Sequence, residues 1–209
     1  MNKEVLGVLC SGRGSNLQSI MDAIDKGKIK APIGVVIANK PDAKALERAE
    51  KAGIPAVCVD NKKCASQQEF EEKLVAVLKE YGVTLVILAG FMRILSPYFV
   101  REFAGRIMNI HPSLLPSFGG AHAHRDVLAY GVKVSGCTIH FVDEGMDSGP
   151  IILQRTVPVL DDDDEDTLAA RVLEQEHIAY PQAIELFLND ALKVNGRKVT
   201  VKKELSERH

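Results

Sequence analysis

Two hydrophobic periodicities alternate along the first half of the chain. Residues 5–10, VLGVLC, are a nearly continuous apolar run, typical of a strand covered on both faces, and residues 16–27 place their apolar side chains at helical spacing. The same alternation predicts strands at 33–38, 55–60, 83–90 and 105–110, and helices at 42–53 and 69–82. Because single helices separate successive strands, the crossovers are expected to be right-handed and the sheet mainly parallel.

The rhythm changes after residue 110. Residues 134–143 and 149–160 read as two longer strands whose short connection favours antiparallel pairing, and a helix is predicted from 167 to 188. The sequence therefore predicts an α/β fold with an open, mostly parallel twisted sheet, helices on both faces, and antiparallel strands in the C-terminal part. No repeat, linker or low-complexity block divides the chain, so we expect a single domain over 1–209 with a peripheral tail at 190–209.

Composition and charge narrow the class of protein. The 26 basic and 28 acidic residues give a net charge of −2, which favours neither nucleic acid nor an anionic membrane as a partner. Charges near the N-terminus and the absence of an apolar run of about 20 residues argue against a signal peptide or a membrane span, so we expect a cytoplasmic protein. Cys10, Cys58, Cys64 and Cys137 form no CxxC pair and are expected to be reduced, buried thiols.

The loop after the first predicted strand is a candidate anion site. It reads CSGRGSNL at 10–17, and the backbone amides of Gly14, Ser15 and Asn16 at the start of a helix suit a phosphate. The spacing matches neither the dinucleotide fingerprint GxGxxG nor the P-loop GxxxxGK[ST], so NAD and ATP lose support. The alternative is that Ser15 and Gln18 form a capping box that only starts the helix.

A second candidate site follows the strand predicted at 105–110. Asn109 and His111 fall on the same face of that strand, at the carboxyl edge where α/β sheets bind ligands, and Pro112 restricts the backbone of His111. An amide donor beside an imidazole suits stabilisation of the oxyanion in acyl transfer, with the imidazole also able to move a proton. A structural role for both residues is the alternative.

The loop at 141–150, FVDEGMDSGP, brings carboxylates to the same edge. Asp147 has glycines two residues away on either side, and a carboxylate close to His111 would favour the protonated, donating imidazole. Asp143, Glu144 and Asp147 are equally typical of a turn.

Histidines in this part of the sequence raise the question of a metal. His122 and His124 could join His111, His140 and Asp147 around zinc, but their spacing matches no zinc signature. The acidic run at 161–166 lacks the alternation of a calcium loop and is explained by a helix that starts after it. We therefore predict no metal.

Four motifs, GRGSNL, AGFMRILSP, NIHPSLLP and DSGPIILQ, together resemble the folate-dependent formyltransferases, over about residues 4–188. GRGSN narrows the resemblance to the members that act on glycinamide ribonucleotide (GAR) in purine biosynthesis. The resemblance implies a Rossmann-like formyltransferase fold. It also implies direct transfer of the formyl group from the co-substrate 10-formyltetrahydrofolate to the amine of GAR, through a tetrahedral intermediate, with no metal and no covalent enzyme intermediate.

The same resemblance implies roles for the candidate catalytic residues. Asn109 and His111 would bind the developing oxyanion, and His111 would act as the acid. Asp147 would keep His111 protonated and help to relay the proton of the amine. These residues belong to a folate-binding and catalytic half at about 101–189.

Binding roles are implied as well. Gly14, Ser15 and Asn16, in a phosphate-binding half at about 1–100, would hold the phosphate of GAR, in agreement with the anion site argued from the residues alone. Glu176 would contact the ribose or amine side of the nucleotide. The folate pocket would be lined by Met92, Arg93, Ile94, Leu95, Asn109 and Val142.

Two positions depart from the family pattern. Gln67 stands where members often have an arginine that meets the glutamate tail of the folate, which puts tail binding in doubt. Gly119 and Gly120 stand where many members have proline and glycine, which should loosen the loop that carries His122 and His124.

Other functions stay open. A formyltetrahydrofolate hydrolase shares the catalytic trio but resembles a chain with an extra N-terminal domain, and methionyl-tRNA formyltransferase resembles one with a C-terminal RNA-binding barrel. We expect room for neither in 209 residues. A non-catalytic folate- and nucleotide-binding module is a further alternative, against which the intact trio weighs. The sequence is compatible with a monomer and with a homodimer.

Overall fold

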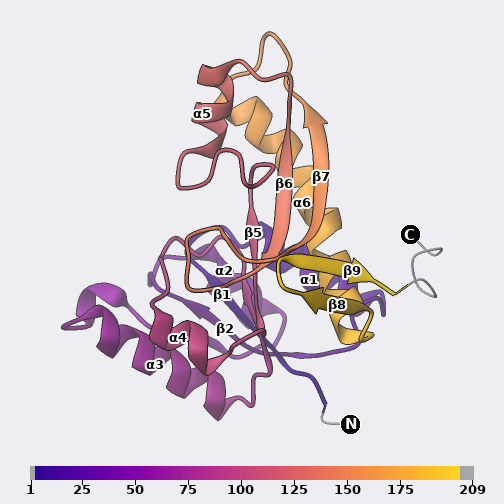
Figure 1. The fold of residues 1–209 in the computed structure, drawn as a ribbon. Helices are drawn as coiled ribbons and strands as arrows, with labels where there is room; N and C mark the ends of the chain where they lie inside the picture. The colour runs from indigo at the N-terminus through magenta and orange to yellow at the C-terminus, as the bar shows by residue number, and fades with distance from the viewer. Residues whose placement is uncertain (1–2, 203–209) are drawn as a thin grey trace. The chain divides into compact units, whose positions relative to one another are not determined.

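The computed structural model describes residues 3–202 and divides the chain into two compact units, Met1–Asn109 and Ile110–His209 (Figure 1). Among the described residues, no helix is long and apolar enough to cross a membrane.

The first unit is built on parallel strands in the order β3-β2-β1-β4-β5. Their bounds are β1 Leu6–Cys10, β2 Ile33–Ala38, β3 Ala56–Cys58, β4 Leu85–Leu88 and β5 Ile107–His111, whose last two residues belong to the second unit. Every residue of β1 and β4 is buried, as the continuous apolar runs of a strand covered on both faces require. The predicted α/β class with a mostly parallel open sheet is thus confirmed.

Helices cover both faces of this part of the sheet. Their bounds are α1 Ser15–Asp25, α2 Lys44–Lys51, the 3₁₀ turn η1 Asn61–Lys63, α3 Gln67–Glu80 and α4 Pro97–Glu102. Helix α1 contacts α2, and α3 contacts α4. Because the chain runs outward from β1 to β3 and then returns to β4, right-handed crossovers place the two helix pairs on opposite faces. The loops after β1 and β4 therefore flank the switch point where such sheets bind ligands.

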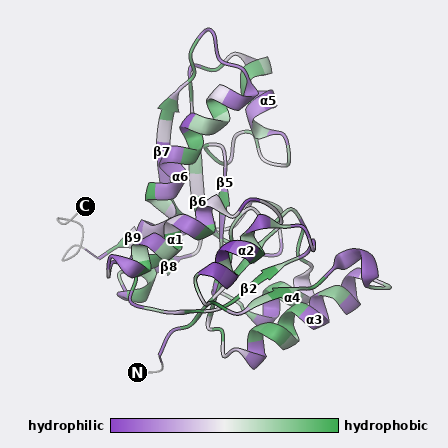
Figure 2. Cartoon of the chain, turned by 180° about the vertical axis from the view of Figure 1, so that it is seen from behind, coloured by the Kyte–Doolittle hydropathy of each residue, from purple (hydrophilic) through white to green (hydrophobic). Residues whose placement is uncertain are grey.

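Hydropathy distinguishes the buried strands from the helices that cover them. Figure 2 shows β2 in green and α2 largely in purple, and α2 buries only Ala45 and Ala49. Small side chains let α2 approach the loop after β1 closely. A Cβ added to Gly14 would lie 2.9 Å from both Cα and Cβ of Ala45. Gly14 also has a φ of 73°, so both its backbone and its surroundings require glycine.

The second unit combines an antiparallel pair of strands with a long helix. Its elements are α5 Ala123–Tyr130, β6 Val134–Phe141, β7 Ile151–Pro158, α6 Glu165–Leu188, β8 Leu192–Asn195 and β9 Lys198–Val201. Strands β6 and β7 pair antiparallel, as predicted, and α6 runs along both (Figure 1). The side chain of Asp164 accepts from Thr167 N (2.8 Å), while Thr167 Oγ1 accepts from Asp164 N (3.0 Å). This capping box explains the acid before the helix.

Residues 190–202 of the predicted peripheral tail form a hairpin. Strands β8 and β9 pair antiparallel, and β9 also pairs with β7 in parallel, with Lys198 opposite Ile151. The turn between them carries Asn195-Gly196, the sequence that favours tight hairpins. Residues 203–209 lie outside the described residues.

The cysteine prediction is half right. Cys10 and Cys137 are buried, and burial raises the pKa of each thiol to about 12. Cys58 is exposed and Cys64 is only partly buried, so the prediction of four buried thiols was wrong. The reason is that Cys58 lies on β3, the outermost strand of its unit, and Cys64 follows the 3₁₀ turn beyond it. All four thiols are free.

Candidate active site

Strand β5 carries two of the predicted catalytic side chains at its end. Asn109 is half-buried and lies opposite Leu88 at the end of β4, and His111 follows on the same face with only 5% of its surface exposed. The fold thus holds both residues at a carboxyl edge, as the spacing predicted.

The structure brings His111 and Asp147 together. His111 Nδ1 lies 3.4 Å from Asp147 Oδ2, and His111 Nε2 donates to the carbonyl oxygen of Phe118 at 2.9 Å. A carbonyl can only accept a hydrogen bond, so Nε2 is the donor to Phe118 O, while Nδ1 faces the carboxylate of Asp147. His111 therefore lies between a backbone acceptor and a carboxylate.

The loop between β6 and β7 holds Asp147 in a defined conformation. Asp147 has a φ of 49°, and its Oδ2 accepts from Gly120 N at 3.0 Å. Within the loop, Asp143 Oδ1 accepts from Gly145 N (3.0 Å) and from Ser148 Oγ (2.6 Å). Asp143 thus acts as the turn residue anticipated as an alternative for all three acids, whereas Asp147 faces His111.

His140 lies next to the catalytic residues, although the sequence suggested it only as a possible zinc ligand. It is 2% exposed, its Nδ1 donates to the carbonyl of Phe141 (2.9 Å), and its Nε2 lies 4.0 Å from Asp147 Oδ1. Burial lowers the pKa of His140 below its ordinary value, against the opposing influence of Asp147. Asp147 therefore lies between His111 and His140, and burial favours the neutral form of His140.

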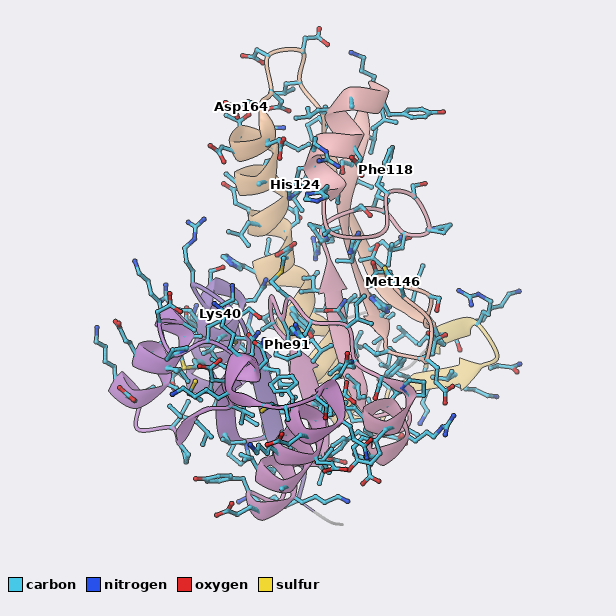
Figure 3. The ribbon with its side chains drawn as sticks, turned by 90° about the vertical axis from the view of Figure 1, so that its left-hand side faces the viewer. Lys40, Phe91, Phe118, His124, Met146 and Asp164 are labelled. Atoms are coloured by element: carbon cyan, nitrogen blue, oxygen red, sulfur yellow. The ribbon has the colours of Figure 1, made fainter. Side chains whose placement is uncertain are left out.

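Helix α5 carries the remaining histidines of interest. His122 is its N-cap residue and His124 lies in its first turn; Figure 3 labels His124, and Phe118 on the preceding loop. Burial lowers the pKa of His124. Over residues 3–202, no group of three or more His, Cys, Asp or Glu side chains has a geometry that could hold a metal ion.

The predicted phosphate loop is the N-terminus of α1. The helix begins at Ser15 after Gly14, and Gln18 N, which bonds to Gly14 O at 2.9 Å, starts its internal hydrogen bonds. The amides of Ser15 and Asn16 thus belong to the first turn, whose N–H groups point out of a helix. The capping-box alternative was wrong, because Ser15 makes no cap bond and the Gln18 side chain donates to Asp22 instead (2.9 Å).

The predicted folate loop after β4 exposes apolar side chains. Met92 and Ile94 are each 67% exposed, whereas Leu95 is 8% exposed and belongs to the core. Arg93 lies over the ring of Phe70. Gln67 Nε2 donates to Ile94 O at 3.0 Å, so the side chain that departs from the family pattern ties this loop down.

Val142 and Glu176 complete the predicted set. Val142 directly follows β6 and is half-buried. Glu176 is 7% exposed on α6, close enough to Cys137 for its charge to add to the effect of burial on the thiol pKa. These two residues belong to the second unit with His111 and Asp147, whereas the phosphate and folate loops belong to the first.

Comparison with known proteins identifies the family. A family model described as formyl transferase matches residues 5–184. The chain belongs to the formyl transferase family. This match contains every predicted site residue, from Gly14 to Glu176, and it runs through both compact units of the formyltransferase.

The curated relatives of this formyltransferase differ in length: some are about as long as this chain, and others are much longer. The phosphoribosylglycinamide formyltransferase of Escherichia coli (strain K12) is 47% identical over 188 residues, covering 90% of this chain and 89% of that protein. The trifunctional purine biosynthetic protein adenosine-3 of Drosophila melanogaster is 50% identical over 186 residues, or 88% of this chain. The chain spans only 14% of the length of that trifunctional relative.

Solved structures agree with the sequence relatives. Glycinamide ribonucleotide transformylase 1 from Symbiobacterium toebii superposes with a TM-score of 0.93 at 47% identity, covering 95% of this formyltransferase and 94% of that chain. Phosphoribosylglycinamide formyltransferase from Anaplasma phagocytophilum superposes with a TM-score of 0.89 at 41% identity, covering 97% and 96% of the two chains. The predicted fold class is that of these proteins.

Proposed function

We propose that this formyltransferase moves the formyl group of 10-formyltetrahydrofolate onto the amine of GAR, giving formylglycinamide ribonucleotide in de novo purine biosynthesis. The observation that carries the proposal is the contact of His111 with Asp147, 3.4 Å apart, beside a strand that also bears Asn109. Relatives that are 47% to 50% identical are named as purine biosynthesis enzymes, which favours this transferase over a hydrolase or a binding module.

The chemistry assigned to the trio is acyl transfer. The amine nitrogen of GAR attacks the formyl carbon, and the carbonyl electron pair moves onto the oxygen. The Asn109 amide and the His111 imidazolium stabilise that oxyanion. As it collapses, the bond from the formyl carbon to the folate nitrogen breaks, and His111 supplies the proton that the leaving nitrogen takes up. Asp147 relays the proton that the amine loses.

For this reaction, the hydrogen bond of His111 to the backbone must be replaced by one to the substrate. His111 Nε2 donates to Phe118 O, and Asp147 faces Nδ1. The proposal therefore requires the carbonyl of Phe118 to give way, so that Nε2 can donate to the substrate. Phe118 has a φ of 54°, its carbonyl also accepts from Ser113 Oγ at 3.1 Å, and Gly119 and Gly120 follow it, so the change would involve the backbone of the glycine pair.

Binding of the substrates is assigned to the remaining residues. Gly14, Ser15 and Asn16 hold the phosphate of GAR, and Glu176 contacts its ribose or amine. The folate pocket consists of Met92, Arg93, Ile94, Leu95, Asn109 and Val142. In this proposal residues 1–209 act as one formyltransferase domain in the cytoplasm, with GAR and 10-formyltetrahydrofolate as its partners.

The test follows deformylation of a 10-formylfolate analogue by absorbance, with and without GAR. The proposal predicts that the purified chain deformylates the folate only when GAR is present. Equal rates with and without GAR would assign the trio to a hydrolase. Binding of both ligands without turnover would assign the chain to the binding modules.

A further inference from the structure

A chain of hydrogen bonds links the carboxyl ends of four strands in the first unit. We call it the edge network: Met92 N donates to Ser11 Oγ (2.8 Å), Ser11 Oγ donates to Asn39 Oδ1 (2.6 Å), and Asn39 Nδ2 donates to Asn61 Oδ1 (3.0 Å). Its four members directly follow β4, β1, β2 and β3 or lie in the loops after them. Ser11 is 5% exposed and Asn39 is 2% exposed.

The donors and acceptors of the edge network match along its whole length. The amide of Met92 can only donate, so the Ser11 oxygen accepts from it. The single proton of that hydroxyl then goes to the side-chain carbonyl of Asn39, whose NH₂ group donates to Asn61. Because the bond between Ser11 and Asn39 is buried and the other two are partly buried, breaking one removes a partner that water replaces poorly.

Ser11 also holds the loop after β4 through its backbone. Ser11 N donates to Gly90 O at 3.1 Å, in addition to the bond that its hydroxyl accepts from Met92 N. Figure 3 labels Phe91, between these two contacts, and Lys40, which follows Asn39. The same Ser11 is the first residue of the loop that leads to Gly14, where α1 begins.

We propose that Ser11 is a positioning residue that couples the two substrate loops of the first unit. The phosphate loop is defined as residues 12–16 and the folate loop as residues 90–95. Since Ser11 is covalently continuous with the first and doubly hydrogen-bonded to the second, a displacement of either loop strains the contacts of the other. The inference rests on the proposed function for the identity of the two ligands. It rests on the edge network for the coupling itself.

The key variant is Ser11→Ala, which leaves the buried carbonyl of Asn39 and the amide of Met92 without their shared partner. We expect the KM values for GAR and for the folate both to rise by about two- to tenfold, the scale of one lost buried hydrogen bond. Asn39→Ala removes the acceptor of the Ser11 hydroxyl and the donor to Asn61 but keeps the bond from Met92 N to Ser11 Oγ, so it should have a smaller effect in the same direction. Since Ser11 and Asn39 share one hydrogen bond, the double variant should raise each KM by less than the product of the two single changes.

Thr84→Val is the matched control. Thr84 Oγ1 accepts from Val5 N at 2.9 Å, which is the same kind of bond between the same neighbouring strands, at their opposite ends. Its loss should lower the melting temperature without changing either KM. Equal KM changes in Thr84→Val and Ser11→Ala would overturn the proposal, because they would reflect stability alone.

Hydrogen exchange of the ligand-free protein separates the coupling from the proposed function. Ser11→Ala should speed amide exchange in both 12–16 and 90–95, whereas Thr84→Val should speed it in neither. Faster exchange confined to 90–95, with a change in the folate KM alone, would overturn the coupling. If wild type showed no GAR-dependent turnover, the function would fail, and exchange would still decide whether Ser11 couples the loops.

Discussion

Replacing Asp147 by asparagine removes its charge and little else. Asparagine has nearly the same shape, and it tolerates the positive φ of 49° that Asp147 adopts, which alanine would strain. The amide oxygen of Asn can still accept from Gly120 N, now 3.0 Å from the carboxylate. The specific loss is the negative charge that faces His111 Nδ1 at 3.4 Å.

The size of the effect follows from this geometry. The His111 side chain is 6% exposed and that of Asp147 is 18% exposed, so solvent screens the pair only weakly. A positioned group that stabilises charge or moves a proton in the transition state contributes about 10²- to 10⁴-fold in rate. Losing the proton relay acts in the same direction, so kcat should fall by about 10²-fold or more. The melting temperature should stay close to that of wild type.

The assay is steady-state deformylation with GAR saturating, together with thermal unfolding of each variant. Glu144→Gln is the matched control, because it removes one negative charge from an exposed position of the same loop. His111→Ala should lose turnover to a similar extent while retaining nucleotide binding. A kcat for Asp147→Asn within threefold of wild type, or an equal loss in Glu144→Gln, would refute the reasoning.

Three further predictions concern other parts of the site. Ser15→Asp should stabilise α1, which has no acid in its first turn, but the new carboxylate should repel the phosphate of GAR. The KM for GAR should therefore rise tenfold or more, whereas the control Ser15→Ala should change it less. An unchanged KM in Ser15→Asp would refute the phosphate site. Burial lowers the pKa of His140 from its ordinary 6.5, so below that pH the unfolded chain binds more protons than the folded one and the folded state loses stability. His140→Gln should therefore reduce the fall in melting temperature between about pH 6.5 and 5. An unaltered slope of melting temperature against pH would contradict this. Arg197 donates to Ser148 O at 2.7 Å, and Ser148 follows Asp147 directly, so Arg197→Ala should lower kcat about two- to fivefold. Arg197→Lys should lower kcat less, and neither variant should alter the KM for GAR. Equal losses of kcat in the two variants would contradict a role for this hydrogen bond.

The parallel sheet could be predicted because its strands are buried on both faces and read as continuous apolar runs. The short helices could not be predicted by periodicity, since α4 and α5 are too brief to establish one. Ser96-Pro97 is nevertheless a helix-start signal, and Asn195-Gly196 is a hairpin signal. Helix α4 and the hairpin of β8 and β9 could therefore be predicted from these local signals, although the hydrophobic pattern does not reveal them.

The contact of His111 with Asp147 was anticipated because both residues follow strands and carboxyl ends meet at one edge. The edge network was not, because it depends on the strand order, which brings Ser11, Asn39 and Asn61 side by side. Nothing in the sequence marks the carbonyl of Phe118 as a partner of His111, since any residue supplies a carbonyl. Backbone partners and non-local polar contacts thus account for most of what the sequence does not reveal.

The most direct test of the central claim follows the formyl group itself. A 10-formylfolate analogue carrying ¹³C in the formyl group is incubated with the protein and GAR, and the products are analysed by mass spectrometry and NMR. The account predicts one labelled formamide on the nucleotide for each folate released, lost together in His111→Ala and Asp147→Asn. Label recovered as free formate, with the nucleotide unmodified, would contradict it.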